Sequence, residues 1–114
     1  MTKNKQLLKR VEKDMQEIEN EYCAKTPLEI FNNAYGIATF CEFADAICFA
    51  CEDDDEYTYF DNIDKLINCN GNLIKKLSDI WREFPHPEHY SFFSSYDAVF
   101  DIINVITSWE NWDK

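Results

Sequence analysis

Residues that break helices are scarce in this sequence. Its 114 residues include only two glycines and three prolines. Since glycine and proline are the residues that most disfavour helix interiors, long helices with few breaks are expected. The sequence therefore predicts an all-α fold, a compact bundle of four to five helices in a single domain that spans residues 1–114.

Long apolar segments are also missing. No run of 18 apolar residues occurs, and no hydrophobic signal-peptide core follows the basic start of the chain. These absences predict a cytoplasmic protein that does not enter membranes. The five cysteines are an odd number, and cytoplasmic thiols stay reduced, so we expect free cysteines and no disulfide framework.

Basic residues are half as numerous as acidic ones. The sequence has 11 lysines and arginines and 22 aspartates and glutamates, which gives a net charge of −11. Residues 14–64 alone carry 14 acids and one base, Lys25, for a net charge of −13. This balance disfavours direct binding to nucleic acid or to anionic membranes, and it favours a protein partner with a basic surface.

The first two helices are predicted from apolar periodicity and capping. Apolar residues at steps of three and four predict a helix over about residues 4–24, with a stripe of Leu8, Val11, Met15, Ile18 and Tyr22. Thr26, Pro27 and Glu29 form a capping box that begins a second helix, which should run from 27 to about 51. Its small-residue row consists of Ile30, Ala34, Ile37, Cys41, Ala44, Cys48 and Cys51. Because this helix is apolar on most sides, we expect it at the centre of the bundle.

Three further helices are expected along the rest of the chain. They cover about residues 56–68, about residues 72–84, and a last segment that begins near Ser95. The stretch 68–72 should be a turn in which Gly71 adopts a positive φ. Two prolines make residues 84–95 a loop.

One segment resembles a known family. The stretch "TPLEIFNNAYGIAT", with its "PLEI" followed by "AYGI", is similar to the start of a small uncharacterised helical family of Gram-positive bacteria and their mobile elements. The resemblance covers about residues 10–39. It implies a bacterial or phage accessory protein, and it brings no known activity or site residues.

Metal and catalytic motifs were weighed and set aside. Cys48 and Cys51 with His86 and His89 contain the four ligands of a Cys2His2 zinc site. However, the two cysteines continue the small-residue row, so we expect packed, reduced thiols and no metal or cofactor. A calcium loop counted from Asp53 fails where Thr58 replaces the required glycine. No catalytic motif occurs, which predicts a non-enzymatic protein.

A run of five acids is the most distinctive local feature. Glu52, Asp53, Asp54, Asp55 and Glu56 follow the expected second helix, and Tyr57 and Tyr59 come directly after. One or two of these acids would suffice to cap the next helix, and negative charge is unfavourable at the end of the preceding one. A partner-binding surface and a merely solvated loop both fit this excess of charge.

The functional hypothesis combines this run with the first helix. Glu17 and Glu21 lie one turn apart, and we expect them to lack a lysine partner. The predicted function is an acidic protein-binding module, in its sharpest form a phage or mobile-element inhibitor, like anti-CRISPR proteins, that occupies the basic nucleic-acid channel of a host protein. The candidate partner-binding residues are Glu17, Glu21, Glu52, Asp53, Asp54, Asp55, Glu56, Tyr57 and Tyr59.

Two alternatives stay open. The first is a homo-oligomer with an interface formed by Phe92, Phe93, Trp109 and Trp112. The second is a zinc protein built on Cys48, Cys51, His86 and His89.

Overall fold

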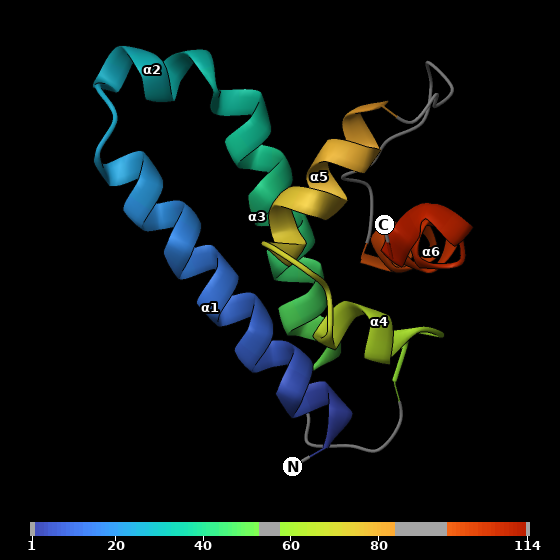
Figure 1. The fold of residues 1–114 in the computed structure, drawn as a ribbon. Helices are drawn as coiled ribbons and strands as arrows, with labels where there is room; N and C mark the ends of the chain where they lie inside the picture. Colours follow the sequence, from blue (N-terminus) through green and yellow to red (C-terminus); the bar gives the residue numbers. More distant parts are fainter. Residues whose placement is uncertain (1, 53–57, 84–95, 114) are drawn as a thin grey trace.

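Helices make up the regular structure of the protein (Figure 1). The computed structural model describes residues 2–52, 58–83 and 96–113. In chain order the elements are α1 (Lys3–Cys23), α2 (Pro27–Asn32), α3 (Ala34–Ala50), α4 (Ile63–Ile67), α5 (Leu73–Glu83), α6 (Tyr96–Thr107) and a 3₁₀ turn (Glu110–Asp113). No strand occurs within these ranges, so the prediction of an all-α bundle is confirmed.

Helix α3 lies at the centre of the bundle, as predicted. It packs against α1, α5 and α6, and Figure 1 shows it running behind α5 between α1 and α6. Its buried residues form the middle of the hydrophobic core: Thr39, Phe40, Phe43, Ala44, Ala46, Ile47 and Ala50. None of the helices in the described ranges is long and apolar enough to cross a membrane.

Helix α1 buries a wider face than the predicted stripe. Leu7, Val11 and Ile18 are fully or almost fully buried, whereas Leu8 and Met15 of the expected stripe are only partly buried. The reason is that α1 contacts three helices, α3, α4 and α5, so more than one narrow stripe of its surface is buried.

The prediction of one continuous helix over 27–51 is wrong. The chain forms α2 and α3, which are separated at Asn33 with φ −106° and ψ 15°. The Asn33 side chain donates a hydrogen bond from Nδ2 to the Glu29 carbonyl at 2.6 Å. Asparagine side chains compete in this way with the backbone hydrogen bonds of a helix, which favours a break.

The small-residue row was also predicted too far toward the N-terminus. Ile30, Ala34 and Cys41 are exposed, and burial along α3 begins only at Thr39. Near the start of α3, an Arg82 nitrogen of α5 would lie 3.7 Å from a Cβ added at Gly36. The expectation that Cys41 is packed is therefore wrong.

The third predicted helix is much shorter than expected. Helix α4 begins only at Ile63, and residues 56–57 lie outside the described part of the chain. Before α4, the backbone is hydrogen-bonded to Asn104 of α6: its Nδ2 donates to the Tyr59 carbonyl, and its Oδ1 accepts from the Asp61 amide, both at 3.0 Å. These contacts with α6 replace the backbone bonds of another helical turn.

The remaining helix and turn boundaries agree closely with those predicted from the sequence. Helix α5 begins and ends within one residue of the prediction, and α6 begins one residue after Ser95. Gly71 has φ +78°, so the predicted turn between α4 and α5 is confirmed. The expected loop over 84–95 lies outside the described residues.

Candidate functional site: an acidic groove between α1, α3 and α6

A groove of about 440 Å³ lies where α1, α3 and the start of α6 meet. Its lining comes from α1, the second half of α3, the segment just after α3 and the first residue of α6: Leu8, Glu12, Asp45, Cys48, Phe49, Glu52 and Tyr96. The groove is an open surface depression and not an enclosed cavity, so its residues are accessible to a partner.

Helical spacing explains why these residues share one surface. Leu8 and Glu12 are one turn apart on α1, and Asp45 lies one turn before Phe49 on α3. Leu8 and Cys48 pack partly against the hydrophobic core, so they form the apolar part of the groove. The carboxylates of Glu12, Asp45 and Glu52 belong to exposed or largely exposed residues, so they remain hydrated at its edge.

Two aromatic rings form one wall of the groove. Phe49 and Tyr96 are stacked, with ring centroids 4.7 Å apart and an angle of 26° between the ring planes. Their exposed fractions are nevertheless 52% and 41%. The pair therefore connects α3 to α6 and still offers aromatic surface to a ligand.

Among the residues that the structure describes, the groove has no internal counter-charge. None of the described lysines or arginines lines it, and none of Glu12, Asp45 and Glu52 forms an ion pair with a described residue. The Cys48 thiol responds to this field: its pKa is raised by burial first and then by the negative charges of Asp45 and Glu12. The groove is thus a site of negative potential.

The negative potential extends along α1 and α3 beyond the groove. Burial raises the pKa of the Cys41 thiol, and the charges of Asp45, Glu42 and Glu19 raise it further. Carboxylates from both helices therefore face the same region.

One member of the predicted acid run lies within the described residues. Glu52 is exposed just after α3 and lines the groove. Asp53, Asp54, Asp55, Glu56 and Tyr57 lie outside the described residues.

The expectation that Glu17 and Glu21 lack lysine partners is wrong. Glu17 lies 3.7 Å from the Lys13 ammonium and accepts a hydrogen bond from Asn72 Nδ2 at 3.3 Å. Glu21 pairs with Lys75 of α5, and the hydrogen bond from that ammonium lowers the pKa of the Glu21 carboxyl. Both acids lie on the α5 side of α1, outside the groove.

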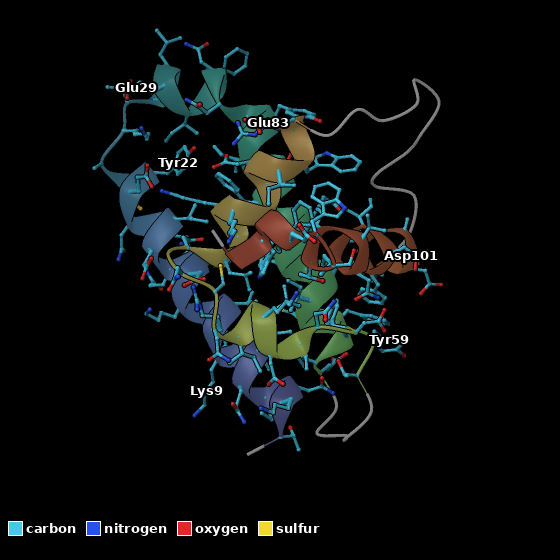
Figure 2. The ribbon with its side chains drawn as sticks, turned by 45° about the vertical axis from the view of Figure 1, so that its right-hand side comes forward. Lys9, Tyr22, Glu29, Tyr59, Glu83 and Asp101 are labelled. Carbon is cyan, nitrogen blue, oxygen red and sulfur yellow. The ribbon has the colours of Figure 1, made fainter. Side chains whose placement is uncertain are left out.

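Tyr59 also lies outside the groove. Its ring stacks on Phe100 at a centroid distance of 5.0 Å, and the side chain is 44% exposed. Figure 2 shows it on the same side of the molecule as Asp101 of α6. Its neighbour Phe60 is buried, as core packing would require.

Only the two cysteines of the alternative zinc site lie within the described residues. Cys51 is fully buried, and burial raises the pKa of its thiol to about 12. His86 and His89 lie outside the described residues. Within the ranges that are described, no group of three or more histidines, cysteines or acids is placed to hold a metal ion.

The aromatic residues of the alternative oligomer interface are only partly available. Trp112 is 2% exposed, with the Lys76 ammonium 4.2 Å from its ring centroid and its indole N–H donating to the Lys65 carbonyl at 3.3 Å. It is a core residue, which corrects that expectation. Trp109 is 36% exposed, and Phe92 and Phe93 lie outside the described residues.

Comparisons with known proteins leave the groove as the main guide to function. No protein-family model, curated protein or solved structure matches the chain. The resemblance of residues 10–39 to a Gram-positive family stays a prediction.

Sequence reasoning missed Glu12, Asp45, Phe49 and Tyr96 as site residues. One signal was present: Glu12 with Glu19, and Asp45 with Glu52, are each seven residues apart and so share a helix face. Which face of α1 lies beside which face of α3 could not be read from that spacing.

Proposed function

We propose that the chain is a non-enzymatic binding module that holds basic side chains of a partner protein in its acidic groove. The observation that carries the proposal is the groove's composition. Three carboxylates that have no cation beside them in the described part of the chain lie next to two stacked, half-exposed aromatic rings.

This combination fits an arginine side chain best. A carboxylate accepts paired hydrogen bonds from a guanidinium, and an aromatic face attracts the same planar cation. Lysine is a compact, strongly hydrated point charge and uses such a planar arrangement less well. The apolar surface of Leu8 and Cys48 would contact the methylene stem of the bound side chain.

We extend the proposal to the class of partner. Acids recur along both helices of this side, at Glu12, Glu19, Glu42, Asp45 and Glu52. A row of carboxylates can enter a groove that normally follows the phosphates of a nucleic acid. The partner would then be a nucleic-acid-binding protein, and the chain an inhibitor of the kind that phages and mobile elements direct against host defences, such as anti-CRISPR proteins.

A fluorescent deca-arginine peptide tests the groove directly. Its binding is measured by fluorescence anisotropy for the wild type and for the double variant Asp45→Asn with Glu52→Gln. The matched control, Asp101→Asn with Glu110→Gln, removes two exposed charges outside the groove. We expect the groove variant to bind about tenfold or more weakly, the control to stay near the wild type, and added salt to weaken binding.

A second variant separates specific recognition from general attraction. Phe49→Leu keeps the charge and removes the stacking surface, so it should speed dissociation more than it slows association. Equal losses in the groove and control variants would mean that net charge alone attracts the peptide, and the proposal would fail. The inhibitor class is tested in two steps. Basic proteins of a host lysate are first captured on the immobilised chain. The wild type and the same variants are then compared in their ability to displace labelled DNA from a captured protein.

A further inference from the structure

The α2 end of the molecule exposes a set of large apolar side chains. Leu28 is 68%, Phe31 77% and Tyr35 59% exposed. Leu28 and Phe31 lie three residues apart on one side of α2, and Tyr35 lies in the first turn of α3, just beyond the break at Asn33. We refer to these three residues as the α2 face. Helix α2 contains no buried residue at all.

Local interactions form this helix although it contributes nothing to the core. Thr26 Oγ1 accepts a hydrogen bond from the Glu29 amide at 3.2 Å and donates one to the Glu29 carboxylate at 3.1 Å. Pro27 occupies the first turn. A six-residue helix is marginal in isolation, and an exposed apolar patch of a few hundred Å² is characteristic of an interaction site.

Charge indicates what covers the α2 face. Residues 23–38 contain one base, Lys25, and one acid, Glu29, in a chain with a net charge of −11. Two copies of so acidic a protein repel each other, and this stretch, which has few charges and no net charge, is where they can approach at least cost. A basic partner would gain no electrostatic attraction there. We propose that the α2 face binds the α2 face of a second copy of this chain.

The charges around the face are self-complementary. In a two-fold interface, residue i of one copy contacts residue j of the other, and j contacts i. If the two α2 helices run antiparallel, Lys25 of each protomer faces Glu29 of its partner. Within the described ranges neither residue forms an ion pair in the single chain. The interface would therefore have an apolar centre and two ion pairs at its edges.

The size of the face sets the strength of the dimer. Three side chains offer only a few hundred Å² per copy, less than the roughly 800 Å² per partner of a standard interface. We therefore expect a reversible, concentration-dependent dimer. The α2 face lies at the start of α3 and the acidic groove near its end, so a dimer could present two grooves at once. Figure 2 places Glu29 at the end of the molecule that also holds Tyr22 and Glu83.

Sedimentation velocity from about 10 μM to about 1 mM tests the proposal. The wild type should show a rising dimer fraction, and Leu28→Ser with Phe31→Ser should raise the dissociation constant by about tenfold or more. Val105→Ser removes a similarly exposed apolar side chain from α6 and should leave the dimer unchanged. Because neither α2 residue is buried in the single chain, the double variant should unfold at the wild-type temperature in dilute solution.

Charge reversal tests the two-fold arrangement. Lys25→Glu should weaken the dimer, and adding Glu29→Lys should restore it, because the pair is re-formed with opposite orientation. Added salt should strengthen the dimer by screening repulsion between the copies, whereas it weakens arginine-peptide binding to the groove. The two proposals can therefore fail separately.

A wild type that stays monomeric up to about 1 mM would overturn the proposal and leave the α2 face to a different protein. A Leu28→Ser, Phe31→Ser variant that dimerises like the wild type would also overturn it. Failure of the charge reversal to restore the dimer would exclude the antiparallel arrangement.

Discussion

At the scale of single residues, Asp14 has a structural role that its charge alone does not suggest. It is 1% exposed, and its Oδ2 accepts hydrogen bonds from Arg10 Nε at 2.8 Å and from the Leu73 amide at 2.7 Å. Leu73 begins α5, so the carboxylate satisfies a free N–H at the start of that helix. Arg10 also donates to the Ile67 carbonyl at 3.0 Å and to the Gly71 carbonyl. The pair thus joins α1 to the α4–α5 turn.

Breaking this pair should be strongly destabilising. Arg10→Met leaves the buried Asp14 carboxylate without its cation, and we expect the free energy of unfolding to fall by about 3–5 kcal/mol. The control Lys13→Met breaks the exposed pair with Glu17 and should change it by less than about 1 kcal/mol. Urea denaturation measures both values. Similar small effects in the two variants would show that the Arg10–Asp14 pair is not a stabilising contact.

The cysteines should differ in reactivity according to their surroundings. Cys23 is exposed, Cys41 is exposed but has a raised pKa, and Cys51 is buried with a pKa of about 12. Alkylation of the native protein near pH 8, followed by mass spectrometry, should therefore modify Cys23 first, Cys41 more slowly and Cys51 last. Cys51 modified as fast as Cys23 would contradict its packing.

The same pKa shift predicts a loss of stability at alkaline pH. The Cys51 pKa is raised in the folded state, so its contribution is fully present below the unfolded value near 8.5 and is lost as the pH rises toward 12. The difference in unfolding free energy between the wild type and Cys51→Ala should shrink across that range.

At the scale of elements, α1 and α2 have equivalent caps but different energetic roles. Thr2 accepts a hydrogen bond from the Lys5 amide at 3.2 Å, and Thr26 accepts one from the Glu29 amide at the same distance. Helix α1 carries part of the core, whereas α2 buries nothing. A helix that buries nothing can open without unfolding the bundle.

The two caps should therefore respond differently to the same substitution. Thr2→Ala should lower the global free energy of unfolding by about 1 kcal/mol, a typical value for an N-cap. Thr26→Ala should lower it by less than about 0.5 kcal/mol while speeding hydrogen exchange at the amides of 29–32. Urea denaturation measures the unfolding free energy of both variants, and NMR measures the hydrogen exchange of their amides. A large global loss for Thr26→Ala would mean that α2 is coupled to the core.

At the scale of the whole molecule, the placement of charge distinguishes two surfaces. Several acids outside the groove are paired internally, as Asp14, Glu17 and Glu21 are, while the three carboxylates of the groove form no ion pair within the described residues. Residues 23–38 at the α2 end carry only Lys25 and Glu29 and are neutral in sum. An electrostatic interface and an apolar interface can therefore coexist on one small chain, and salt should affect them with opposite sign.

Local signals in the sequence determined the helical class, the capping box at Thr26, the turn at Gly71 and the bounds of α1 and α5. Each depends on contacts within about one helical turn, so pattern alone predicts it. The break at Asn33 was also locally encoded, but an asparagine inside an apolar pattern is compatible with either outcome. Only the tertiary structure decided that Asp14 is buried, that Lys75 pairs with Glu21, and that Glu12 meets Asp45 and Phe49 in one groove. Those facts depend on which faces of α1, α3, α5 and α6 pack together, and the free energy that selects this packing comes from contacts between residues far apart in the chain.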